Sequence, residues 1–191
     1  MENRRQQRIE RTVDHHKVID EGIATNKQDS GQPHHSGLPK LTIELVPASA
    51  WYSNMRKLVK RSVWDQIRKE VYAAYDHRCG ICGADTRLEC HEIWEYDDVR
   101  HIQRLTGLIA LCKLCHFVKH LGLAGILASE GRLDLEVVVA HYMTINKCDR
   151  EAYQTHKTIA FREWRERSEH EWQVDLGTFS EQFGLTQATG K

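Results

Sequence analysis

The sequence predicts an α+β protein that is mostly helical, in which a small core is flanked by helices and preceded by a disordered N-terminal tail. Three observations support this fold class. Apolar residues recur at helical spacing in residues 62–75, 133–146 and 150–172. Residues 88–93 alternate with the two-residue period of a strand. Four of the six cysteines lie in two pairs around that strand.

The N-terminal segment has two parts. Residues 1–40 are polar, mixed in charge and without sustained periodicity, which predicts a disordered tail. Residues 41–47 (LTIELVP) alternate apolar and polar side chains and end at a proline. This pattern is typical of a short edge strand or of an extended lead-in to the core, and both alternatives stay open. Trp51 and Tyr52 are then expected to pack on the core.

Residues 62–75 form the clearest predicted helix. Ser62 can cap its N-terminus, and Asp65 follows three residues later, in the spacing of a capping box. One face of the helix is apolar and should pack on the core; it consists of Trp64, Ile67, Val71 and Tyr75.

The C-terminal part of the chain is predicted to be helical. A helix over residues 121–131 should end by Gly131. A second helix spans residues 133–146, with Leu135, Val138, Val139 and Tyr142 on its apolar side. A third begins after Asp149, which can cap it, and runs to about Trp172. The remaining C-terminal residues carry little pattern.

The cysteine spacing predicts a metal site. Cys79-x-x-Cys82 and Cys112-x-x-Cys115 are separated by 29 residues, and each pair can form a tight knuckle that places two thiolates on one tetrahedral Zn²⁺. Four thiolates leave no open position, so this zinc is expected to be structural. The N-terminal residues lack the apolar run of a secretion signal, so we expect a cytoplasmic, reducing compartment, where such pairs favour metal over disulfides. The two other cysteines, Cys90 and Cys148, are expected to pack as small apolar residues.

Three histidines predict a second site. His116 and His120 are spaced i, i+4, so a helix that starts near Cys115 would project both from one face. His91 lies on the preceding strand and could complete a three-nitrogen site. Such a site keeps an open position for water or a phosphate oxygen, which is typical of a catalytic metal.

The formal net charge is zero, which leaves a nucleic-acid partner open because the distribution of charge matters more than its sum. Residues 54–79 hold seven basic and three acidic side chains. This excess fits either contact with phosphates or a solvated helix face, and charge alone does not separate the two. The longest apolar stretches are only a few residues long, so no membrane span is expected.

The cysteines and histidines, in this order, resemble those of the HNH endonuclease family over residues 78–122. The resemblance implies a ββα-metal core, in which about residues 87–96 and 105–111 pair as a β-hairpin and a helix runs from about Cys112 to Leu121. It implies that the four cysteines form the zinc staple. The chain then divides into a tail, a lead-in strand with a basic helix, the core and a C-terminal helical region, at residues 1–40, 41–77, 78–122 and 123–191.

Two departures from the family's pattern concern the general base. The family's first motif is a dipeptide, Asp-His or His-His, whose first residue binds the metal and whose second is the base. Placing it on LECHEIW gives His91 as the ligand and Glu92 as the base; the other register gives Cys90 as the ligand and His91 as the base. The first register is preferred because it keeps Cys90 buried and Ile93 in the apolar position. The family's middle asparagine is replaced by Gly107.

The resemblance implies a metal-dependent endonuclease that hydrolyses phosphodiester bonds in DNA and needs no small-molecule cofactor. His91, His116 and His120 would hold a divalent metal (Mg²⁺, Mn²⁺, Ni²⁺ or Zn²⁺), and the catalytic residues would be His91, Glu92 and His116. The DNA backbone would be held by basic side chains, namely Arg56, Lys57, Lys60, Arg61, Arg68, Lys113 and Lys119. Two other hypotheses are a zinc module that binds nucleic acid without cutting it and a zinc-stabilised protein-interaction domain.

Overall fold

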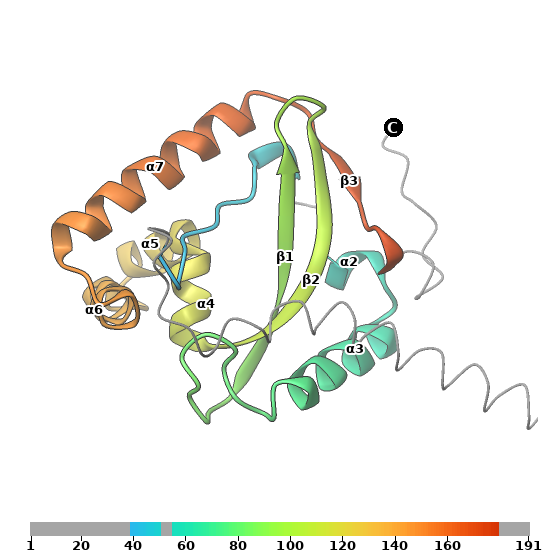
Figure 1. Ribbon diagram of the computed structural model, residues 1–191, viewed down its shortest axis with the longest axis horizontal. Coiled ribbons are helices and arrows are strands. Elements are labelled where there is room, and N and C mark those ends of the chain that lie inside the picture. The colour runs from blue at the N-terminus through green and yellow to red at the C-terminus, as the bar shows by residue number, and fades with distance from the viewer. Residues whose placement is uncertain (1–38, 51–54, 180–191) are drawn as a thin grey trace, which may run out of the picture.

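The structure is a computed structural model that describes residues 39–50 and 55–179. It is an α+β fold in which helices lie on both sides of a small three-stranded sheet (Figure 1), so the coarse fold class predicted from the sequence is confirmed. The predictions for the tail up to residue 38 and for Trp51 and Tyr52 lie outside the described residues. Within the described ranges, no helix combines the length and the apolar character that a membrane crossing requires.

A long β-hairpin forms the centre of the fold (Figure 1). Strand β1 (Leu88–Asp97) pairs antiparallel with β2 (Ile102–Cys112), and His91 lies opposite Ile109. Both strands extend farther toward the hairpin turn than the predicted ranges, about 87–96 and 105–111. A short third strand, β3 (Gln173–Asp175), pairs parallel with β2 and was not predicted.

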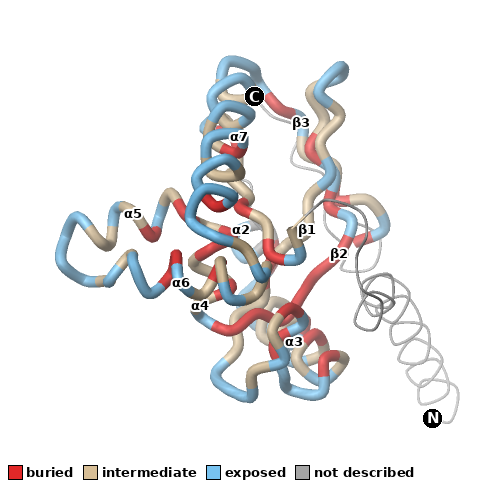
Figure 2. The backbone as a smooth tube through the Cα atoms, turned by 60° about the vertical axis from the view of Figure 1, so that its left-hand side comes forward, coloured by how far each residue is buried: buried red, intermediate tan, exposed pale blue. Residues whose placement is uncertain are grey.

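Strand β2 is the middle strand of the sheet and its most buried element. Residues 107–112 are all buried, which fits their continuous apolar sequence, whereas β1 is mostly half-buried. Figure 2 shows this buried stretch of backbone passing between α3 and α4. The packed strand therefore fixes the position of Cys112, at the start of the following helix.

Helix α3 (Arg61–Ala74) packs across the hairpin through the predicted apolar face. Ile67 and Val71 are each only 1% exposed. The predicted cap at Ser62 is wrong. The extended N-cap conformation falls on Lys60, with no side-chain cap, and Ser62 already lies within the first helical turn.

Helices form most of the chain after the hairpin: α4 (Lys113–Lys119), α5 (Leu121–Ser129), α6 (Leu135–Asn146) and α7 (Arg150–Ser168). Helix α4 starts directly from the end of β2 and packs against α6 and the hairpin. Asp149 caps α7 as predicted, because its side chain accepts a hydrogen bond from the backbone N–H of Ala152. This helix ends before the predicted Trp172, and the chain then turns to form β3.

Residues 41–46 form the extended lead-in rather than an edge strand. Leu41 is fully buried, and the side chain of Asn146 bonds both its backbone N–H and its C=O at 2.9 Å. The backbone N–H of Glu44 donates to the C=O of Lys119 at 3.0 Å. The lead-in therefore lies against the end of α4, and it is followed by a 3-10 turn and a short helix, η2 (Ala48–Ala50) and α2 (Met55–Leu58).

Candidate metal centres

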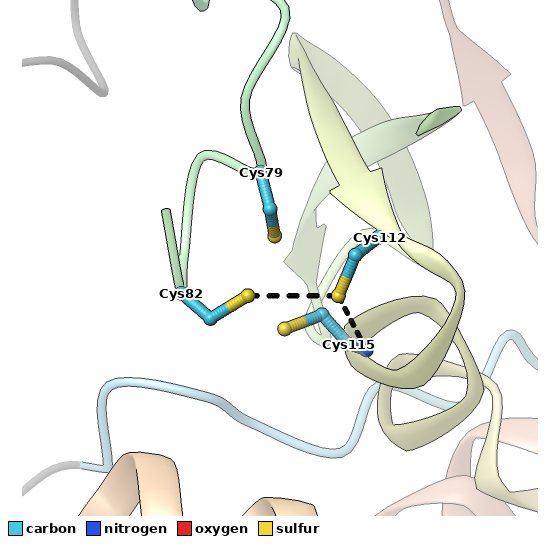
Figure 3. A group of neighbouring side chains, drawn as sticks. All are labelled: Cys79, Cys82, Cys112 and Cys115. Carbon is cyan, nitrogen blue, oxygen red and sulfur yellow. Dashed lines mark hydrogen bonds between the residues drawn. The ribbon is translucent and has the colours of Figure 1, made fainter. Parts of the chain in front are cut away.

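The four paired cysteines meet at one point, with their sulfurs facing one another (Figure 3). Cys79 and Cys82 lie on the loop between α3 and β1, Cys112 ends β2, and Cys115 lies in the first turn of α4. Their ligand atoms all lie within 4.8 Å of one another, and the Sγ atoms of Cys82 and Cys112 are 3.6 Å apart. Tetrahedral zinc would place its sulfur ligands about 3.8 Å apart. These free thiols could therefore hold a metal such as zinc.

Local backbone geometry shapes both cysteine pairs. Gly83 has a φ of 75°, a left-handed conformation that favours glycine. A Cβ atom on Gly80 would lie 2.5 Å from Cε1 of Tyr75, so a larger side chain there would displace the ring. In the second pair, the Sγ of Cys112 accepts the backbone N–H of Cys115 at 3.4 Å. The local backbone conformation and its close contacts therefore position both cysteine pairs.

The cysteine group perturbs the pKa values of its own thiols. Hydrogen bonds from Cys112 and Cys115 lower the pKa of Cys79 far below its ordinary value. Cys115 acts to lower the pKa of Cys112, but the bond with Cys79 and burial raise that pKa to about 11. The pKa of Cys115 is raised by its bonds to Cys112 and Cys79. Because a thiolate at one of these three cysteines disfavours ionisation of the other two, a bound cation would favour their thiolate forms.

Three histidines form the second group. His91 lies on β1 and His116 on α4, and His120 lies at the junction of α4 and α5. Their ligand nitrogens lie within 4.8 Å of one another, and the Nδ1 of His91 is 3.1 Å from the Nε2 of His120. Nitrogen ligands on a tetrahedral zinc-sized cation would lie about 3.3 Å apart. The structure therefore brings together the three histidines that the sequence singled out, in a group that could hold a metal ion.

Two of these histidines bond carboxylates through their outer nitrogens. Oε2 of Glu89 lies 2.5 Å from Nδ1 of His116, and Oε2 of Glu44 lies 3.4 Å from Nε2 of His91. Neither glutamate was predicted from the sequence. Strand alternation could have found Glu89, which shares the His91 side of β1, whereas no local signal links His91 to Glu44, 47 residues away.

Burial favours the neutral form of two of the histidines, His91 and His120. Burial is the largest cause of the lowered pKa of His91, and it lowers the pKa of His120 to about 3. The hydrogen bond from His116 lowers the pKa of Glu89. Burial would raise the pKa of Glu44, but the bond with His91 and the charge of Lys119 hold it well below its ordinary value. A neutral imidazole backed by an ionised carboxylate, as in the His91–Glu44 pair, is a usual form of a metal-binding histidine.

A cavity of about 740 Å³ lies beside the histidine group and is lined by all three histidines. Arg56 and Arg68, both predicted to hold DNA, line the same cavity, as does Arg87, which was not predicted. The other predicted contacts are placed differently. Four are exposed, namely Lys57, Lys60, Arg61 and Lys113.

Lys119 does not fit its predicted role as a DNA contact. It is only 8% exposed, and its Nζ bonds the hydroxyl of Thr42 at 2.8 Å and the carboxylate of Glu44. The helix turns this ammonium toward the lead-in rather than toward solvent. Its charge therefore acts inside the protein, next to the histidine group.

Glu92, the predicted base, and its neighbours differ in how they lie relative to the histidine group. Alternation along β1 places Glu92 on the same face as Cys90 and opposite to His91. Glu92 lines the cavity but is not part of the histidine group. Cys90 packs half-buried against the core, which fits the register that makes His91 a ligand. Gly107 is buried opposite Ile93, so no side chain projects from the position of the family's asparagine.

Comparisons with protein-family models, with curated proteins and with solved structures found no match, so the resemblance to HNH endonucleases depends on the residues and their geometry alone.

Proposed function

We propose that the protein is a metal-dependent endonuclease of the HNH type that hydrolyses phosphodiester bonds in DNA. The observation that carries this proposal is the histidine group. His91, His116 and His120 converge with carboxylates on two of their outer nitrogens, at the wall of a cavity lined by arginines. A site with three nitrogen ligands leaves a position open for substrate, which a purely structural metal does not need.

The two centres have different roles in this proposal. The four cysteines hold a structural zinc that joins the loop before β1 to the start of α4. The histidines hold a second divalent cation, which supplies Lewis-acid stabilisation of charge at the scissile phosphate. Arg56, Arg68 and Arg87 face the cavity and bind neighbouring phosphates.

Glu92 is the proposed general base, because it lines the same cavity as the ligands and His91 is already engaged by Glu44 and His120. To act, its carboxylate must come within hydrogen-bond reach of the attacking water. The opposite facing of Glu92 and His91 along β1 favours a second candidate function, a zinc module that binds nucleic acid without cutting it.

Plasmid nicking separates the two functions. Purified protein should nick or linearise supercoiled DNA with at least one of Mg²⁺, Mn²⁺, Ni²⁺ or Zn²⁺. His116→Ala should abolish cleavage while one tightly bound zinc per chain is retained. His77→Asn is the matched control, because His77 is exposed and its backbone conformation, with φ of 55°, tolerates asparagine.

Cleavage that survives His116→Ala would point to a contaminating nuclease or to another site. Salt-sensitive DNA binding without cleavage under any of the four metals would favour the second candidate. The base is tested by Glu92→Gln, which should lower the cleavage rate about 100-fold or more while DNA affinity is retained. Full activity in this variant would exclude Glu92 as the base.

A further inference from the structure

The carboxylate of Glu44 reaches the histidine group from outside the hairpin and helix that supply the histidines. Its Oε2 lies 3.4 Å from Nε2 of His91, while its Oε1 accepts the ammonium of Lys119 and, at 2.9 Å, the hydroxyl of Thr42. A single side chain therefore connects a candidate ligand to a buried cation.

The bond to Glu44 determines which nitrogen of His91 faces the other histidines. Because Nε2 is turned toward the carboxylate, Nδ1 is the nitrogen that lies 3.1 Å from Nε2 of His120. A carboxylate accepts only from a protonated ring nitrogen, so it favours the tautomer whose lone pair is on Nδ1. His91 is only 3% exposed, so solvent has little access to replace this partner.

The lead-in holds Glu44 firmly in this position. Its backbone N–H bonds the C=O of Lys119, and the neighbouring Ile43 donates its N–H to Nε2 of His156 at 3.0 Å. Farther back, Asn146 bonds both backbone groups of Leu41. Helices α4, α6 and α7 thus all contribute to placing one carboxylate.

Glu44 also balances a charge that would oppose metal binding. Lys119 is 8% exposed, and among the described residues the carboxylate it bonds is that of Glu44. Without that carboxylate, a buried ammonium would lie unpaired near the histidine group and would repel an incoming cation.

We propose that Glu44 is a positioning residue of the histidine metal site, which holds His91 in its Nε2–H tautomer and neutralises Lys119. This inference rests on the proposed metal-dependent function, because it assigns a role at the same site.

The test measures cation binding and the histidine tautomer separately. Co²⁺ is titrated into protein whose cysteine site is already loaded with zinc, and its affinity is measured by calorimetry. Glu44→Gln keeps the shape of the side chain and an acceptor oxygen but removes the charge, so it should weaken Co²⁺ binding about 10–100-fold. Glu44→Ala should weaken binding at least as much and should also change the tautomer of His91. That tautomer is read from the ring-nitrogen NMR shifts of the cation-free site.

Glu95→Gln is the matched control, since Glu95 is an exposed glutamate on β1, the strand that carries His91, and this variant should bind Co²⁺ as the wild type does. The inference is wrong if both Glu44 variants bind Co²⁺ as tightly as the wild type while His116→Ala does not bind it; the proposed metal site would then stand. If the wild type takes up no second ion, the proposed function fails, and the inference fails with it.

Discussion

Removing the metal from the cysteine site should destabilise the whole fold. The site ties the loop after α3 to the junction between β2 and α4. Cys79, Cys112 and Cys115 are 3%, 5% and 0% exposed and belong to the hydrophobic core. A change at these sulfurs is therefore transmitted to the hairpin and to α4 together.

The size of the effect follows from the four-thiolate ligand set. Structural zinc binds such sets with about 10–16 kcal/mol. At about 10 µM free metal, this corresponds to about 3–9 kcal/mol of stabilisation for a protein that binds only when folded. Since 1 kcal/mol changes the Tm of a chain of this size by about 2–4 °C, metal removal should lower the Tm by at least about 6 °C.

The assay is thermal unfolding followed by circular dichroism, before and after treatment with a strong chelator, with the metal content determined on the same samples. Cys112→Ser should reproduce the loss. Cys148→Ser is the matched control, because Cys148 is half-buried and lies outside the metal group. If the chelated protein is free of metal but its Tm stays within about 2 °C of the untreated value, the expected stabilisation is refuted.

Three further predictions concern residues around the two centres. Gly80→Ala should lower the free energy of unfolding by about 1–3 kcal/mol in denaturant titrations, because its new Cβ would overlap two neighbouring side chains; an unchanged midpoint would show that the site relaxes freely. Asn146→Ala should cost about 1–3 kcal/mol by the same measurement, since it removes two hydrogen bonds of 2.9 Å that hold the lead-in; a loss below about 0.5 kcal/mol would contradict this. His141→Ala should weaken zinc binding about 10–100-fold in a competition titration, because His141 Nε2 lies 3.1 Å from the Sγ of Cys115; equal affinity would mean that this contact does not support the ligand.

The parts of each centre that are close in sequence were predictable from the sequence. A Cys-x-x-Cys pair brings its own sulfurs together, and His116 and His120 share a helix face because they are spaced i, i+4. The apolar face of α3 was predictable for the same reason, since its periodicity is local. The cap at Ser62 was not, because the end of a helix depends on the surrounding packing as well as on the capping residue.

Whether these parts of the chain meet at one site depends on the register in which β1 pairs with β2. His91 meets the α4 histidines only because β1 pairs with β2 in the observed register, with His91 opposite Ile109. A slip of one residue would turn His91 to the face of α3 and bring Cys90 or Glu92 to the site instead. Buried β2 fixes this register, and the alternation of the sequence was enough to favour it. The same alternation separates His91 from Glu92, which the family pattern alone did not reveal.

What the sequence determined by itself was the presence of two groups of candidate metal ligands and the kind of atom in each, because residue type and short spacing can be read directly from it. Only the tertiary structure decided which other residues contact these two groups. Glu44 reaches His91 because Asn146 and His156 hold the lead-in against the helices, and Lys119 turns inward to meet it. These contacts join residues 47 to 113 positions apart, and no local pattern encodes them.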